Sequence, residues 1–130
     1  MDVKDLFLVC VHEAGHIVVG QQTGSVLLGV VFADGFSCET LFYTGPSREK
    51  IASACLLAAG ACAEEVVFGT REGFHKGDFQ KIQALGYCPE AIVSLVRDSF
   101  SWGDLYRVAG KLFSFLSSGR RFVLSSELMG

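Results

Sequence analysis

Apolar residues dominate the segment 3–22, and their spacing predicts one long helix. Asp2 stands where a residue that caps the first helical turn is favoured, and Gly24 stands where helices commonly stop. The apolar positions give this helix a broad apolar surface. These positions include Leu6, Val9, Cys10 and Ile17.

The period of the pattern changes over residues 25–44. The stretches "SVLLGVVFA" and "SCETLFYT" are rich in branched and aromatic residues, which favour strands. Asp34-Gly35 between them is a strong signal for a two-residue hairpin turn. We expect a two-stranded antiparallel ribbon, to which another strand could be joined, ended by Gly45-Pro46.

The rest of the chain reads as helices. Ser47 can cap a long helix that ends near Phe68, with Gly69 in the stopping position. A glycine-rich loop follows, and Asp78 opens a short helix over 78–85. Further helices are expected over 89–100, 104–117 and 120–128. The predicted fold is mainly α with a small antiparallel β-ribbon, in a single domain over 1–130.

Composition narrows the functional classes. The 130 residues are 50% apolar and carry a net charge of −3 with no basic stripe, so we expect no nucleic-acid partner. The mean hydropathy of +0.40 is compatible with a homo-oligomer or a membrane-associated partner.

An odd number of cysteines without a CxxC pair indicates a reducing compartment and small buried side chains. These cysteines are Cys10, Cys38, Cys55, Cys62 and Cys88. With no signal peptide or membrane-spanning helix expected, the predicted location is cytoplasmic.

The motif His12-Glu13-Ala14-Gly15-His16 puts three titratable groups inside the first apolar segment. Four residues turn a helix by about 400°, so His12 and His16 lie one turn apart on one face. Two such imidazoles can hold one zinc ion, and Glu13 beside them can act as a general base on water. The structural alternative is a pair of surface or satisfied core histidines. Since unpaired polar groups are costly to bury in an apolar helix, the pattern favours a metal site.

A catalytic zinc ion needs a third protein ligand and an open position, and the residues alone leave that ligand open. Asp78 is a candidate, although it also stands where a helix N-cap is expected. Glu64 or Glu65 could instead support the histidines from behind, or both could be surface charges. His75 could polarise a carbonyl group or be solvated. The candidates for the third ligand are Glu64, Glu65, Asp78, His75 or a cysteine.

The block "HEAGHIVVG", a hairpin ending in "TLFYT", the helix "AAGACAEEVVFG" and then Asp78 resemble the peptidase domain of the FtsH family of ATP-dependent zinc proteases. The resemblance is strongest over residues 5–85. It implies an FtsH-peptidase-like helical zincin domain, with zinc held by His12, His16 and Asp78. It also implies Glu13 as the general base of a zinc metallopeptidase that acts on peptides or unfolded proteins. The strand Glu39–Thr44 could then pair with an extended substrate.

The chain departs from that family in several respects. It has no G-x-x-x-x-G-K-[ST] phosphate loop, so we expect this chain to bind no ATP and to act without it, or beside a separate ATPase partner. The arginine of the family's "GGRAAEE" stretch is absent. One alternative is a non-catalytic, zinc-stabilised binding or scaffolding module. Another is a different short HExxH peptidase that takes its third ligand from Glu64 or Glu65. The presence of Glu13 favours catalysis, because zinc binding alone does not require it.

Overall fold

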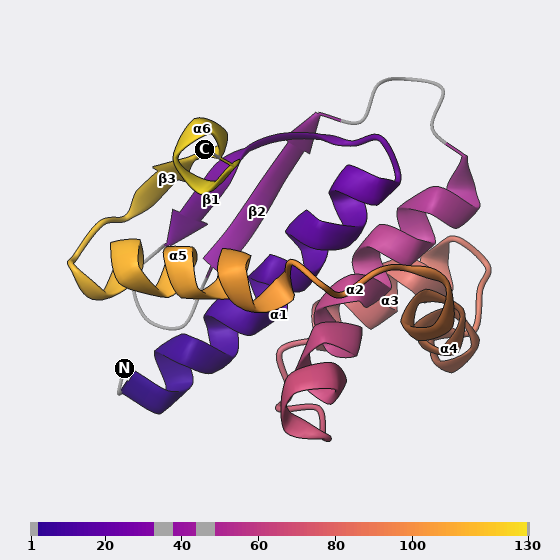
Figure 1. Ribbon diagram of the computed structural model, residues 1–130. Helices are drawn as coiled ribbons and strands as arrows, with labels where there is room; N and C mark the ends of the chain where they lie inside the picture. Colours follow the sequence, from indigo (N-terminus) through magenta and orange to yellow (C-terminus); the bar gives the residue numbers. More distant parts are fainter. Residues whose placement is uncertain (1–2, 33–37, 44–48, 130) are drawn as a thin grey trace.

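The computed structural model describes residues 3–32, 38–43 and 49–129 of the chain, and it is mainly helical with one small sheet (Figure 1). The elements in chain order are α1 (Val3–Gln22), β1 (Val26–Phe32), β2 (Cys38–Tyr43), α2 (Lys50–Phe68), α3 (Lys76–Ala84), α4 (Pro89–Ser99), α5 (Leu105–Ser117), β3 (Phe122–Leu124) and α6 (Ser125–Met129).

Most of the expected helices are confirmed. α1 covers the predicted 3–22, and α4 and α5 lie within one residue of the predicted 89–100 and 104–117. α2 ends where expected, at a left-handed Gly69 (φ +78°) whose N–H donates to the Glu65 carbonyl oxygen. Three features that the sequence predicts lie outside the described residues. They are the Asp2 cap, the Asp34-Gly35 turn and Gly45-Pro46. The prediction of Ser47 as the cap of the second helix was wrong, because α2 begins at Lys50 and its N-cap residue is Glu49.

The sheet has three antiparallel strands in the order β2-β1-β3. The prediction of a helix over 120–128 was wrong, because Phe122–Leu124 pair with Gly29–Val31 of β1 and only the short α6 follows. Val123 is buried between two exposed neighbours, which is the alternation of a strand with one face on the core. The third strand joins the expected ribbon from the far end of the chain. β2 therefore forms one edge of the sheet.

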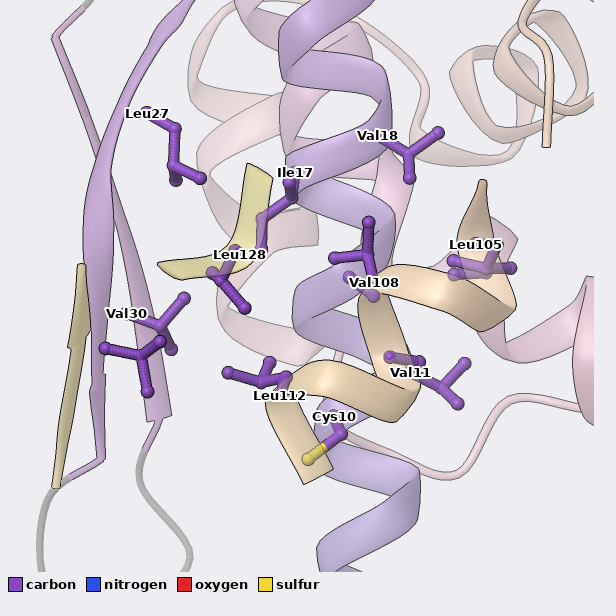
Figure 2. Packing of buried hydrophobic residues seen from close by; sticks show 14 of the residues in the cluster. Cys10, Val11, Ile17, Val18, Leu27, Val30, Leu105, Val108, Leu112 and Leu128 are labelled. Carbon is purple, nitrogen blue, oxygen red and sulfur yellow. The ribbon is translucent and has the colours of Figure 1, made fainter. Parts of the chain in front are cut away.

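Helix α1 lies at the centre of the molecule. It packs against the sheet and α5 on one side and against α2 on the other (Figure 1). Figure 2 shows Leu27 and Val30 of the sheet directed toward the α1 side chain Ile17 and the α5 side chain Leu112. A second buried cluster lies between α2, α3 and α4. As a result, thirteen consecutive residues of α1, Leu8–Gly20, are buried on all sides of the helix.

Small side chains allow α1 and α2 to approach closely. A Cβ atom on Gly15 would lie 2.5 Å from both the Ala59 carbonyl oxygen and the Ala63 Cβ.

Among the described residues, α2 is the one helix whose length and composition would suit a membrane span. Half of that apolar window is buried inside the fold, so its hydropathy is weak evidence for a membrane.

The cysteines are mostly the small buried hydrophobes that composition predicts. Cys10, Cys55 and Cys62 are buried and unbonded to one another. The prediction was wrong for Cys88, which is exposed because it precedes Pro89 at the first turn of α4, on the surface of the molecule. The side chain of Cys38 lies outside the described part of the structure.

Candidate metal centre

His12, His16 and Asp78 meet in one group of potential metal ligands. The Nε2 atoms of the two histidines are 3.1 Å apart, and the Asp78 Oδ2 atom lies 3.2 Å from each of them. Both histidines are buried in α1, and Asp78 is partly buried in α3. The expected spacing in α1 therefore brings the two imidazoles to one point, and α3 brings a carboxylate to the same point.

The structure excludes the alternative that Asp78 is the N-cap residue of its helix. α3 begins at Lys76, its N-cap residue is His75, and Asp78 is the third residue of the first turn. The carboxylate of Asp78 faces the two imidazoles instead, where charge-assisted hydrogen bonds are stronger than a bond to a neutral backbone N–H. A negative charge in the first turn also interacts favourably with the helix dipole. The capping role thus does not compete with the role of a ligand.

The other ring nitrogen of each histidine has a partner that fixes the ring. The Nδ1 atom of His12 lies 2.8 Å from the Glu64 Oε2 atom, and the Nδ1 atom of His16 lies 2.8 Å from the Leu56 carbonyl oxygen. Since both partners are acceptors, each Nδ1 carries the hydrogen and each Nε2 is available as a ligand atom. Both rings are thereby oriented with Nε2 toward Asp78.

Glu64 is the glutamate that supports His12, a choice between Glu64 and Glu65 that the sequence left open. Its side chain is fully buried, and its second oxygen accepts a 2.8 Å hydrogen bond from the backbone N–H of Glu72. Glu65 points elsewhere and pairs with Arg71 and Arg97. Gly60, one turn before Glu64, leaves room for the ring, because a Cβ atom there would overlap the His12 imidazole.

The three facing atoms fit the size of a metal site. A tetrahedral ion with metal–ligand bonds of about 2.0 Å separates its ligand atoms by about 3.3 Å, close to the 3.1–3.2 Å between these atoms. Two imidazole nitrogens and one carboxylate oxygen also form a donor set that divalent transition metals accept. The His12, His16 and Asp78 group could therefore hold a metal ion.

The charges of the group suit a cation. Burial lowers the pKa of His12, but hydrogen bonds to Asp78 and Glu64 outweigh it and raise that pKa to about 10. Burial raises the pKa of Asp78, yet hydrogen bonds from His12 and His16 hold it well below its usual range. Without a metal, a proton on His12 thus balances part of the negative charge of the two carboxylates. A metal ion would take the place of that proton.

Glu13 lies beside the group on the same helix. It is buried, and its Oε2 atom accepts a 2.6 Å hydrogen bond from the Thr40 hydroxyl group on β2. Glu13, both histidines and Asp78 line one open pocket of about 470 Å³. The walls of this pocket come from β2, α2 and the loop before α3. They include Thr40, Phe42, Leu56, Leu57 and Phe74.

The remaining candidates stand apart from the metal group. His75 packs its ring against Phe79 at 4.6 Å, and its Nδ1 atom is buried without a hydrogen-bond partner among the described residues. Burial lowers the pKa of His75, so the ring tends to be neutral. The thiol of Cys62 donates to the Val93 carbonyl oxygen. Sequence reasoning did not single out Thr40 or the Leu56 carbonyl, since neither carries a motif and both are brought in by tertiary packing.

No protein-family model matches this chain, and no curated protein matches it. The site therefore has to be interpreted from its own geometry.

Exchange of Glu64 for glutamine tests the support of His12. Glu64→Gln keeps the shape but removes the charge behind the ring, so we expect metal affinity to fall about 10- to 100-fold. Titration against a chelating indicator would measure it. Glu72→Gln, an exposed glutamate in the neighbouring loop, is the matched control and should leave affinity unchanged. Equal affinity of the two variants would contradict the supporting role of Glu64.

Metal binding should release a proton. The pKa of His12 is raised to about 10 in the metal-free fold, so its contribution to stability is full below about pH 6.5 and is lost as pH rises toward 10. Metal affinity should increase with pH over the same window, because less work is needed to remove that proton. Calorimetric titration near pH 7 in two buffers of different ionisation enthalpy should show about one proton released per metal. Binding without proton release would contradict this assignment.

Proposed function

We propose that this chain is a zinc-dependent metallopeptidase that hydrolyses peptide bonds. The observation that carries the proposal is the meeting of His12, His16 and Asp78 on an open pocket, with Glu13 beside them. Each of the three groups on α1 has a hydrogen-bond partner that orients it. A metal group with an adjacent buried carboxylate suits hydrolysis better than structural metal binding alone.

Zinc is the metal that we infer for the group. Two imidazoles and one carboxylate form the three-ligand set of many hydrolytic zinc sites, and three protein ligands leave one position open. When bound, zinc would act as a Lewis acid that polarises the scissile carbonyl group and acidifies water. The contacts of Nδ1 with Glu64 and Leu56 would keep both imidazoles in the required tautomer.

Glu13 would move the proton. A carboxylate oxygen of Glu13 would accept the proton of the attacking water as that water adds to the carbonyl carbon, and it would then deliver the proton to the nitrogen of the leaving amine. The Thr40 hydroxyl group holds the Oε2 atom of Glu13 at 2.6 Å, which restricts the carboxylate to one orientation. The other oxygen of Glu13 has no partner in the hydrogen bonds of the described residues and would be available for this transfer.

The substrate would be a peptide or an unfolded protein segment. β2 is an edge strand of the sheet and contributes Glu39, Thr40 and Phe42 to the pocket. An extended peptide could pair with this edge and lie across the metal group. Leu56, Leu57 and Phe74 give the pocket apolar walls, which favour an apolar side chain next to the scissile bond.

The resemblance to FtsH peptidases belongs to the same proposal. A mainly helical fold with a small antiparallel sheet is compatible with an FtsH-peptidase-like zincin domain. The sequence has no phosphate-binding loop, so the proposed reaction does not use ATP in this chain. We propose cytoplasmic action, alone, as a homo-oligomer, or beside a separate ATPase or membrane-associated partner.

A non-catalytic, metal-stabilised binding module is the second candidate. The observation in its favour is the outer face of the sheet, where Leu28, Phe122 and Leu124 are each more than two-fifths exposed. Such a module would need the metal ligands but not the carboxylate of Glu13. Catalytic assays of a metal-loaded Glu13 variant therefore separate the two candidates.

The exchange Glu13→Gln should lower peptidase activity by about 10²- to 10⁴-fold, since the amide cannot accept the proton. Cleavage of an unfolded protein such as casein would be measured with equal metal loading, because Glu13 is not among the proposed ligands. Glu39→Gln is the matched control: it removes an exposed carboxylate from the rim of the same pocket and should keep most activity. Full activity in Glu13→Gln, or no cleavage by the loaded wild-type chain, would contradict the proposed function.

A further inference from the structure

Asp78 lies on α3, which is much less buried than α1 and α2, the two other helices beside the metal group. Among the residues of α3, Ile82 alone is buried, whereas α1 is buried along Leu8–Gly20. The N-cap residue of α3, His75, makes no capping hydrogen bond with its side chain. The position of the Asp78 carboxylate therefore depends on contacts outside α3 itself.

Arg71 supplies such contacts from the loop between α2 and α3. Its guanidinium group makes two hydrogen bonds to Glu90 on α4, with Nη1–Oε1 at 2.6 Å and Nη2–Oε2 at 2.8 Å. Its Nε atom donates to the Glu65 Oε1 atom on α2, also at 2.6 Å. The same group lies over the ring of Phe79 on α3, 5.1 Å from the ring centre. One side chain thus connects α2, α3 and α4.

The geometry of this cluster makes it stronger than an ordinary surface ion pair. The side chains of Arg71 and Glu65 are only 19% and 21% exposed, so solvent screens their interaction less. The paired hydrogen bonds to Glu90 match the planar fork of a guanidinium group, which a lysine cannot reproduce. Arg97 of α4 adds a second contact to Glu65 at 3.6 Å. Phe79, which Arg71 covers, is the residue that follows Asp78 in α3.

We propose that Arg71 is a positioning residue of the metal site, holding α3 against α2 and α4 so that Asp78 stays against His12 and His16. It touches neither the metal group nor the pocket, and it acts through the orientation of α3. The inference rests on the metal site of the proposed function but does not depend on peptidase activity. His12 has its own support from Glu64, so loss of Arg71 should weaken chiefly the Asp78 ligand.

The test compares Arg71→Gln with Arg120→Gln. Arg120 also forms a 2.8 Å ion pair, with Glu127, but on the far part of the chain. With cobalt(II) as a coloured probe and a competing chelator, we expect Arg71→Gln to weaken affinity about 10- to 100-fold and to change the visible spectrum of the ion. Arg120→Gln should leave both unchanged. In the metal-free protein, α3 amides should exchange hydrogen faster in Arg71→Gln, while α5 amides should not.

Two further variants keep the proposal open to refutation. Glu90→Gln alters an exposed residue, so the fold should survive even if Arg71→Gln unfolds, and it should weaken cobalt binding in the same direction. With cobalt(II) raised until the Asp78→Ala variant binds it through His12 and His16, the further change Arg71→Gln should lose most of its effect on affinity. If Arg71→Gln or Glu90→Gln binds cobalt(II) as tightly as the wild-type chain, the positioning role is wrong. It is also wrong if Arg71→Gln lowers the affinity as much without Asp78 as with it. Both results would leave the proposed function standing. A wild-type chain that binds no divalent metal would overturn the proposed function as well.

Discussion

The structure depends on the need to satisfy three polar side chains in the buried middle of one helix. His12, Glu13 and His16 lie within the buried segment of α1, where an imidazole or a carboxylate without a partner would be strongly destabilising. Each finds at least one partner on another element. The partners are Glu64 and the Leu56 carbonyl on α2, Asp78 on α3 and Thr40 on β2. The packing of these elements around α1 therefore also brings the residues of the site together.

The same constraint explains the composition of α2. This helix has to bring Glu64 behind His12 while it packs closely on α1, and large side chains would prevent the approach. Gly15 meets Ala59 and Ala63 at the crossing, and Gly60 leaves space for the His12 ring. The carboxylates of the buried Glu64 and the partly buried Asp78 then place negative charge beside the two imidazoles. That charge favours a proton or a metal cation between the two imidazoles.

The sequence predicted the local parts of this arrangement better than the long-range ones. The helical period was enough to put His12 and His16 on one face, because that relation involves one turn of one helix. The residues alone left Asp78 among several candidates, since its meeting with His12 joins positions 66 apart. The sequence also could not show whether Glu64 or Glu65 supports His12. Neighbours on a helix point about 100° apart, so the choice depends on how α2 is rotated against α1.

Two errors have the same physical origin. The third helix was expected to open at Asp78, where a cap was the alternative to a metal ligand, but α3 begins at Lys76 and contacts with two imidazoles from another helix orient Asp78. Residues 122–124 were included in a helix because three residues carry too little local signal. Pairing with β1 makes them a strand, and that pairing is visible only in the tertiary structure.

The most direct test of this account is the metal content of the purified chain beside that of its Asp78→Ala variant. Elemental analysis after purification without chelators, followed by reloading with zinc, would give the stoichiometry of each. The account predicts about one zinc ion per wild-type chain and a loss or marked weakening of binding in the variant, with the fold preserved. No metal in the wild-type chain, or equally tight metal in both proteins, would contradict a centre formed by His12, His16 and Asp78.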